Sequence, residues 1–384
     1  MLPAWKTASK NKPVTAKWPP GLHFEHPWLK QRPHECVHHK GLPNIPDGRS
    51  EQVSSLMTRQ RATAVTSVLD SMSVSEVQSE HVSHAKTAAG CIKATRCHPS
   101  VQTRSGDMAQ KTVLIVYAHQ SVGSFNSAVR DAAVKELAKQ GYKVIVSDLY
   151  AMNFKASATQ DDIIGDLENP KLFQYGEETM HAWLDGRLSD DIMAEQQKVK
   201  EAELIIFQFP LYWFSVPAIM KGWMDRVLAQ GFAFSLEKMY NHGVFKDKKA
   251  MLSFTTGATE SMFRPDGING DINVTLWPLQ NGTLHFCGFQ VLAPQIFWSP
   301  AHRTLTVRTA MLQSWEERLK GLLAEKPLTF APCELFGLSF QEGFSLLPHV
   351  KEEQKSNTHG ITTGHHLGKP LPPDNQTKAH STDN

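Results

Sequence analysis

The chain has 384 residues, of which 41% are hydrophobic and 20% charged, and its formal net charge is +2 at pH 7. This is more than one typical domain requires and is enough to bury a large core. Residues 1–107 carry 14 Lys and Arg against 8 Asp and Glu, which leaves 26 against 30 in residues 108–384. Such a mildly acidic body lacks the basic footprint of a nucleic-acid-binding protein.

Residues 1–107 are rich in Pro, Lys and His and show little sustained periodicity, so this segment is predicted to be a disordered extension. Its WPPG stretch interrupts the amphipathic helix that a mitochondrial presequence requires. A zinc site is the sharpest alternative, but the spacing of its candidate ligands is loose: Cys36, His39, Cys91, Cys97 and His98. Met108 opens MAQKTVLIVYAHQ, which is typical of a natural start.

The cysteine pattern indicates no disulfide framework, because the chain has five cysteines and the two beyond residue 107 lie far apart, at Cys287 and Cys333. We therefore expect a reducing compartment, the cytosol. The segment LIIFQFPLYWFSVPAIM (204–220) carries no charge, but Pro210 and Pro217 would break it as a helix. A membrane span needs ~18 or more uninterrupted apolar residues, so none is predicted.

From residue 112 the sequence alternates between apolar, β-branched runs and helical patterns. Residues 151–202 are interpreted as a long insertion, and residues 327–384 as a C-terminal tail. This alternation predicts an α/β fold with a doubly wound, parallel, five-stranded sheet that is covered on both faces. The predicted elements, in chain order, are a strand at 112–118, a helix at 126–140, strands at 143–150 and 203–209, a helix at 217–230, and strands at 250–256 and 289–298.

The loops that follow the strands are the candidate binding segments, because ligands of open parallel sheets bind at the carboxyl ends of the strands. AHQSVGSFNSAV lacks the GxGxxG fingerprint, but it places Ser124 and Asn126 at a helix N-terminus, which favours a phosphate; simple N-capping is the alternative. PLYWFSVP (210–217) offers aromatic rings for a flat ligand, unless it is a packed surface loop. TTG (255–257) allows close backbone approach, or is only a turn. Together the three loops predict a flavin nucleotide site.

Several longer motifs resemble the NAD(P)H:quinone oxidoreductases, the DT-diaphorase family, from about Met108 to near the C-terminus. They are SDLYAMNF (147–154), FQFPLYWFSVPAIMKGWMDRV (207–227), TTG (255–257), LHFCGFQVLAPQ (284–295) and GHHLGK (364–369). The resemblance implies a flavodoxin-like fold over residues 108–326, a tail at 327–384 packed near the active site, and bound FAD. It also implies a cytosolic homodimer with active sites at the subunit interface, and two-electron quinone reduction in a ping-pong cycle.

The resemblance also implies roles for individual residues. It places the reacting wall of the flavin at Gly257, Phe263 and Asn269. FAD contacts are implied at His119, Ser124, Phe125, Asn126, Gln174, Leu211, Tyr212, Trp213, Phe214, Thr255, Thr256, Gly257, Ala258, Phe263 and Arg308. The pocket in which nicotinamide and quinone take turns is implied at Phe234, Ser235, Leu236, Met262, Phe286, His302 and Phe340. No metal is expected, since Asn281 stands where the zinc-binding branch of the family needs a histidine beside His285.

The departures from the family pattern leave the electron donor open. Phe263 and Asn269 replace the tyrosine and histidine of the family's charge relay, and Ala258 replaces a glycine. Asn269, Phe234 and Leu236 resemble the branch that uses dihydronicotinamide riboside, whereas the tail resembles the NAD(P)H branch. Two other functions stay open: a flavin-bound interaction protein with little turnover, and a flavodoxin-type FMN electron carrier.

Overall fold

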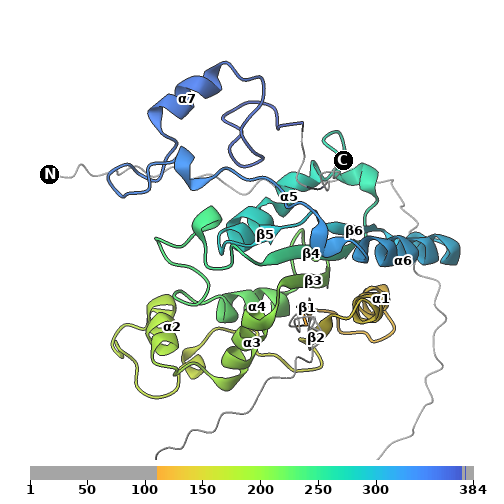
Figure 1. Ribbon diagram of the computed structural model, residues 1–384, viewed down its shortest axis with the longest axis horizontal. Helices are drawn as coiled ribbons and strands as arrows, with labels where there is room; N and C mark the ends of the chain where they lie inside the picture. The colour runs from red at the N-terminus through yellow and green to blue at the C-terminus, as the bar shows by residue number, and fades with distance from the viewer. Residues whose placement is uncertain (1–109, 374–376, 378–384) are drawn as a thin grey trace, which may run out of the picture. The chain divides into compact units, whose positions relative to one another are not determined.

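The computed structural model describes residues 110–373 and residue 377, which all belong to one compact unit, Ser100–Asn384 (Figure 1). The extension at 1–107, with its predicted disorder and its alternative zinc ligands, lies outside the described residues. Six parallel strands form one sheet in the order β2-β1-β3-β4-β5, and β6 also pairs with β4. The order 2-1-3-4-5 is that of flavodoxin-like proteins, which confirms the predicted fold class. The strands are β1 (Thr112–Tyr117), β2 (Lys143–Asp148), β3 (Leu204–Pro210), β4 (Lys249–Thr256), β5 (Gln290–Val291) and β6 (Gln295–Trp298).

The strand predicted at 289–298 is two short strands rather than one. β5 pairs with the start of β4, and β6 pairs with its end. Pro294 lies between them and has no backbone N–H for a ladder hydrogen bond, which accounts for the interruption. The Leu292 N–H still donates to the carbonyl of Ala250 (2.8 Å), so the segment stays along the edge of β4.

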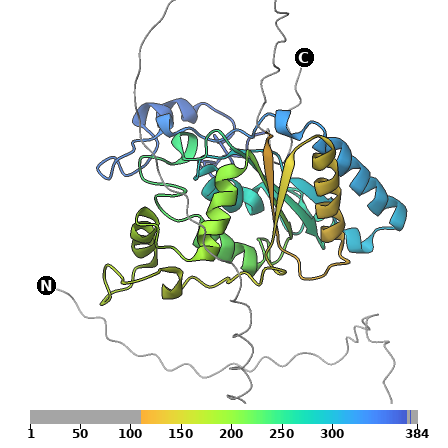
Figure 2. The ribbon, with the colours of Figure 1, turned by 60° about the horizontal axis from the view of Figure 1, so that its bottom comes forward.

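Helices cover both faces of the sheet, as the apolar strands require. Alternate residues of β1 face opposite sides: Ile115 packs with α1 (Phe125–Lys139) and α6 (Leu305–Leu319), and Val116 packs with α4 (Ala218–Val227). Figure 2 shows α1 and α6 on one side of the strands and α4 on the other. The first layer is joined by a hydrogen bond from Trp315 Nε1 to the carbonyl of Val129 (3.2 Å). The opposite face also carries α5 (Ile272–Leu279).

Residues 151–202, predicted to be an insertion, contain the helix that connects β2 to β3. This segment holds α2 (Tyr175–Leu184) and α3 (Asp190–Glu201), and α3 contacts both β1 and α4. The buried face of α3 carries Glu195 and Gln196 as well as apolar residues, so the helix has little apolar periodicity to reveal it. Glu195 is fully buried and accepts hydrogen bonds from Ser147 Oγ and Trp223 Nε1, both 2.8 Å long.

A short segment beyond α6 runs back over the sheet and carries the C-terminal tail. The Leu328 N–H donates to the carbonyl of Val291 (2.7 Å), and α7 (Pro348–Lys355) follows further along (Figure 1). None of the helices in residues 110–373 is long and apolar enough to cross a membrane. The remaining short helices are η1 (Gln160–Asp162), η2 (Tyr240–His242), η3 (Glu260–Phe263), the π-helix η4 (Gln280–His285), η5 (Pro300–His302), η6 (Leu322–Ala324) and η7 (Cys333–Leu335).

Candidate functional site

The loops after β1, β3 and β4 meet at one edge of the sheet. The strand order reverses between β1 and β3, and the carboxyl ends of β3 and β4 are in register, with Pro210 opposite Thr255. Open α/β sheets bind their ligands at such a switch point. The loop after β1 reaches the loop after β3 through a hydrogen bond from Gln120 Nε2 to the hydroxyl of Tyr212 (3.4 Å).

The loop after β3 holds two aromatic rings out of the core. Tyr212 and Ser215 exchange both backbone hydrogen bonds (3.0 Å each), which closes a tight turn over Trp213 and Phe214. Both central residues have positive φ, 49° and 61°, a conformation that costs of the order of 1–3 kcal/mol for a non-glycine residue. Trp213 is nevertheless 95% exposed. The fold therefore stabilises a strained turn that presents a bare aromatic surface, as expected of a platform for a flat ring.

A hollow of about 180 Å³ lies between this turn and the loop after β4. The loop is shaped by a hydrogen bond from Thr256 Oγ1 to the carbonyl of Ala258 (2.6 Å), and the space around Gly257 is open. Phe263 packs edge-on against Phe214, with ring centroids 5.7 Å apart. The fold thus brings together eight residues that the sequence predicted for the flavin ring and its reacting wall: Leu211, Trp213, Phe214, Thr256, Gly257, Ala258, Phe263 and Asn269.

A chain of buried hydrogen bonds connects the two halves of this edge. Ser253 Oγ donates to Gln208 Oε1 (2.6 Å), Gln208 Nε2 donates to Asn126 Oδ1 (2.9 Å), and Asn126 Nδ2 donates to Thr255 Oγ1 (2.9 Å). All four side chains are at least nine-tenths buried. These hydrogen bonds fix the loop after β1, predicted to bind a phosphate, relative to the loop after β4, predicted to contact a flavin ring. Sequence analysis missed Gln208 and Ser253, although each is a polar residue inside an otherwise apolar strand.

The predicted phosphate side has the structure of a capped helix N-terminus. Ser124 caps α1 by accepting a hydrogen bond from the Ser127 N–H (3.2 Å), so the capping alternative is present. His119 accepts a hydrogen bond from the Ser121 N–H (3.0 Å), and burial lowers the pKa of its imidazole. The ring of Phe125 packs on Phe297 at 5.5 Å, which leaves its backbone as the group that could contact a ligand.

Several other predicted site residues do not line this hollow. Gln174 precedes α2, with its amide on Glu177 (2.6 Å), and Arg308 lies in the first turn of α6. His302 lies in η5, and Met262 is an exposed residue of η3.

The remaining predicted substrate residues gather beside the tail. Phe234 contacts Phe286 with ring centroids 5.2 Å apart, and the Ser235 hydroxyl donates to Glu237 (2.9 Å). Leu236 and Phe340 line a second hollow of about 380 Å³. No residue of this second hollow lines the hollow beside Trp213.

His285, beside which the family resemblance would place a second zinc ligand, makes an aromatic contact. The His285 ring stacks on Phe330 at 4.4 Å, and burial lowers its pKa to about 4. Among residues 110–373, no three His, Cys, Asp or Glu side chains are placed to hold a metal ion.

Comparison with known proteins identifies the family. The profile of the flavodoxin-like fold family matches residues 111–319. NAD(P)H dehydrogenase [quinone] 1 from Cavia porcellus is 52% identical over 271 residues, which are 71% of this chain and 98% of that protein. The chain belongs to the NAD(P)H:quinone oxidoreductase family. It is therefore an oxidoreductase.

Members of both branches of the quinone oxidoreductase family resemble this chain. Ribosyldihydronicotinamide dehydrogenase [quinone] from Rattus norvegicus is 56% identical over 229 residues, covering 60% of this chain and 99% of that protein. Among solved structures, a putative quinone reductase from Klebsiella pneumoniae superimposes with a TM-score of 0.60 at 35% identity, covering 67% of this chain and all of that chain. The sequence identities to the two branches, 52% and 56%, are similar, so they do not decide which electron donor this chain uses.

Proposed function

We propose that this protein is an FAD-dependent quinone reductase, which uses a reduced nicotinamide to reduce quinones to hydroquinones by two electrons in a ping-pong cycle. The observation that carries the proposal is the hollow between the strained aromatic turn at Trp213 and Phe214 and the open turn at Gly257. The relatives at 52–56% identity, which are named as NAD(P)H and ribosyldihydronicotinamide quinone dehydrogenases, support the same chemistry.

The residues around the hollow fit a flavin ring. Trp213 offers an almost fully exposed face for stacking, and no neighbouring atom would meet a side chain at Gly257, so a ring can approach the backbone there. The first turn of α1 supplies the helix N-terminus for a phosphate group. When bound, a flavin supplies hydride transfer from a nicotinamide to a quinone.

The protein's own contribution is positioning and electrostatics. We propose that Trp213 and Phe214 orient the flavin ring, and that backbone N–H groups of the Gly257 turn donate hydrogen bonds to its polar edge. Phe263 is buried against Phe214 and excludes water from that wall, but its ring cannot donate a hydrogen bond. The Asn269 side chain lines the same wall and is uncharged. Neither residue supplies the proton relay implied by the family pattern.

We propose that the active protein is a homodimer. The predicted site residues line separate hollows: residues predicted for the flavin ring line the one beside Trp213, whereas Leu236 and Phe340, predicted for the substrate pocket, line the one beside the tail. A second copy of the chain would place Leu236 and Phe340 of one subunit over the flavin of the other. Sedimentation equilibrium of the purified flavoprotein should give twice the chain mass, and a monomer that retains full turnover would contradict the proposal.

We assign residues 108–326 to the catalytic domain, residues 327–384 to a tail that contributes to the active site, and the protein to the cytosol. Both described cysteines, Cys287 and Cys333, are free thiols, which supports a reducing compartment. Fractionation of cells that express the full chain tests this assignment, and recovery with an organelle would contradict it.

Anaerobic reduction of the bound cofactor tests the proposed reaction. The released cofactor is first identified by chromatography, with FAD expected; FMN would favour the electron-carrier alternative, and no flavin at all would overturn the proposal. The flavin absorbance is then followed after mixing with NADPH, NADH or N-ribosyldihydronicotinamide, and after adding a quinone such as menadione. We expect bleaching by at least one donor and recovery with one equivalent of quinone.

The donor comparison also separates the two branches and the interaction-protein alternative. Bleaching by the dinucleotides would assign donor choice to the tail, whereas bleaching by the riboside alone would assign it to Asn269, Phe234 and Leu236. If the protein binds FAD but none of the three donors bleaches the flavin, it would instead be an interaction protein. The residues Phe263 and Ala258, which differ from the family pattern, would then explain the missing turnover.

A further inference from the structure

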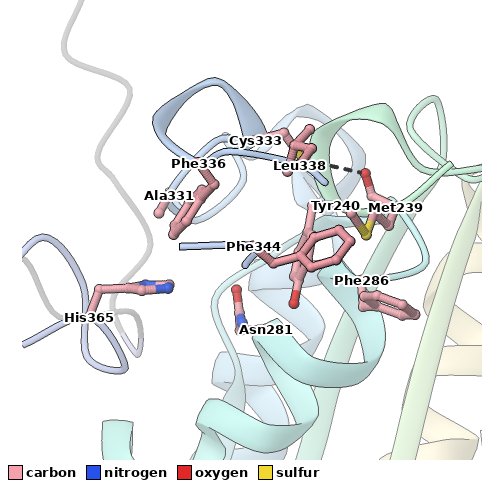
Figure 3. Close-up of a pocket in the computed structure, with 10 residues that line it drawn as sticks. All are labelled: Met239, Tyr240, Asn281, Phe286, Ala331, Cys333, Phe336, Leu338, Phe344 and His365. Atoms are coloured by element: carbon pink, nitrogen blue, oxygen red, sulfur yellow. Dashed lines mark hydrogen bonds between the residues drawn. The ribbon is translucent and has the colours of Figure 1, made fainter. Parts of the chain in front are cut away.

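A third cavity, of about 240 Å³, lies beneath the C-terminal segment (Figure 3). We refer to it as the tail pocket. It shares no residue with the hollow beside Trp213, and among the predicted site residues only Phe286 lines it. It is lined by Met239, Tyr240, Asn281, Phe286, Ala331, Cys333, Phe336, Leu338, Phe344 and His365.

Half of the residues that line the tail pocket carry aromatic rings. Tyr240 meets Phe286 edge-on at 5.2 Å, and Phe336 meets His365 at 5.3 Å. Phe344 adds a further ring from the tail to the lining (Figure 3). Aromatic walls of this kind favour a flat aromatic ligand, through stacking and edge-to-face contacts.

Two polar side chains of the tail pocket, Asn281 and Tyr240, make no hydrogen bond to the described residues. Asn281 is only 8% exposed, yet its side-chain amide makes no hydrogen bond to the described residues. Figure 3 shows Asn281 and Tyr240 among the lining residues, and the Tyr240 hydroxyl is also without a hydrogen-bond partner in the described part of the chain. The Asn281 amide is thus accessible from the pocket, although the residue as a whole is nine-tenths buried. Its donor and acceptor are therefore free to hydrogen-bond a group that enters the pocket.

The backbone around Asn281 is also unusual. Asn281 lies in the π-helix η4, and such segments occur frequently at functional sites. In the same segment the side-chain amide of Gln280 and the Nε2 of His285 are buried without hydrogen bonds to the described residues. The backbone therefore departs from regular α-helical hydrogen bonding at Asn281, which lines the pocket.

The polar groups at the tail pocket are uncharged, which restricts the ligand. Burial raises the pKa of Tyr240, so its hydroxyl stays protonated, and burial lowers the pKa of His365, so its imidazole is neutral near pH 7. The Nδ1 of His365 is hydrogen-bonded to the Thr362 hydroxyl (2.8 Å). Cys333 is a buried thiol whose pKa is raised by burial, so it adds no charge. A charged ligand would find no counter-charge on these walls.

We propose that the tail pocket binds a neutral aromatic molecule of one or two rings that carries a hydroxyl or carbonyl group, with that group hydrogen-bonded to Asn281 and Tyr240. The volume is below the ~300–1,000 Å³ of pockets for drug-sized ligands, which sets the size of the molecule. Four of its lining residues, Met239, Cys333, Leu338 and Phe344, also line the hollow beside Leu236, so the occupied pocket would order the tail next to the predicted substrate residues.

Calorimetric titration of the purified full-length protein with 2-naphthol tests the proposal. We expect saturable binding of 2-naphthol and no binding of 2-naphthoate, whose carboxylate is charged. Asn281→Leu should weaken 2-naphthol binding by about tenfold, and Tyr240→Phe by several-fold, because each variant removes a hydrogen bond. The matched control Tyr142→Phe removes a hydroxyl elsewhere and should leave the affinity unchanged. Unchanged affinity in Asn281→Leu, or no saturable binding of 2-naphthol, would overturn the proposal.

Two further readouts separate the tail pocket from the flavin site and from misfolding. A ligand beside the flavin perturbs its visible spectrum, so we expect 2-naphthol to bind without such a change; a spectral shift that persists in Asn281→Leu would overturn the proposal. Thermal unfolding should show Asn281→Leu to be at least as stable as the wild type, since it removes an unpartnered amide. The titration does not require a flavin, so its result is independent of whether FAD binds.

Discussion

Phe263 is the residue at which the proposed flavin wall differs most in chemistry from the pattern that the family resemblance implies. It is buried between Phe214 and Trp298, with ring centroids 5.7 and 5.8 Å away, and it lines the hollow beside Gly257. This packing fills the space of an aromatic ring but leaves the wall without a hydroxyl donor. Removing one donor of this type from an enzyme costs about 2.7–4 kcal/mol of transition-state stabilisation.

Phe263→Tyr should therefore accelerate flavin reduction. We expect the rate to rise by up to about a hundredfold to a thousandfold, since the ring is kept and one donor is added to the wall. The measurement is anaerobic stopped-flow bleaching of the flavin with the donor that the wild type prefers. Phe173→Tyr, at a ring that packs on Tyr175, is the control and should leave the rate unchanged. An unchanged rate in Phe263→Tyr would show that the protein does not use this wall for donation.

The buried imidazole of His285 makes the stability of the fold depend on pH. Burial lowers its folded-state pKa from 6.5 to about 4, so between these pH values the unfolded chain binds a proton that the folded chain does not. Stability that is present above pH 6.5 is therefore lost as the pH falls toward 4. We expect His285→Phe to lose less stability over this window, by up to about 3 kcal/mol. Urea denaturation at several pH values measures the difference, and parallel curves for the two proteins would refute the assignment.

At the scale of elements, α4 is attached to the β2–α3 connection by buried charges. Arg226, which is 1% exposed, donates to both oxygens of the fully buried Asp162 (3.0 Å each) and to Asp191 (2.6 Å). Burial alone would raise the pKa of Asp162, but hydrogen bonds from Arg226, Lys155 and Tyr175 outweigh it and hold the pKa below its usual value. The helix that follows the aromatic turn is thus fixed by an ion pair rather than by apolar contacts alone.

Replacing Arg226 should destabilise the protein strongly. In Arg226→Met the carboxylate of Asp162 stays buried without its main partner, and we expect the free energy of unfolding to fall by about 3–5 kcal/mol. Lys221→Met, on the same helix, removes only an exposed pair with Asp225 and should change the free energy by less than about 0.5 kcal/mol. Urea denaturation at pH 7 measures both. Equal effects would mean that the buried pair has no special weight.

At the scale of the whole described region, the tail is joined to the η2 segment by a small polar cluster. Asn241 Nδ2 donates to both carboxylate oxygens of Glu334 (3.1 and 3.2 Å), and Asn241 Oδ1 accepts from the Cys333 N–H (2.8 Å). His242 Nε2 lies 2.8 Å from the same carboxylate. Because these groups are mostly exposed, the cluster fixes the tail's position more than it contributes to stability.

Asn241→Ala should loosen the tail without unfolding the sheet. The Cys333 N–H loses its acceptor, so we expect amide hydrogen exchange in residues 333–336 to become at least several-fold faster, while exchange in β1 and β3 stays unchanged. Mass spectrometry of peptides from the two proteins measures this. Asn357→Ala, which removes a local hydrogen bond to Gln354 within the tail, is the control and should not affect residues 333–336. Unchanged exchange at Cys333 would show that the tail is held by other contacts.

The sequence by itself determined the sheet and the place of the three candidate binding loops. Apolar, β-branched runs such as TVLIVY can be satisfied only by burial on both faces, so strand identity and parallel pairing follow from local pattern. The same reasoning placed the aromatic and glycine loops at the carboxyl edge of the sheet. It failed for α3, because a buried face that includes Glu195 and Gln196 has no apolar period, and for 289–298, where Pro294 divides the strand.

Only the tertiary structure decided which side chains act together. The hydrogen bonds that run from Ser253 through Gln208 and Asn126 to Thr255 join residues up to 129 positions apart. Nothing in the local sequence indicates that these residues meet. The positive φ values at Trp213 and Phe214 and the unpartnered amide of Asn281 are likewise invisible in sequence, since each is a conformation maintained by surrounding packing. Local composition fixes which segments are buried, but burial brings distant polar groups into contact, and their partners depend on the packed fold.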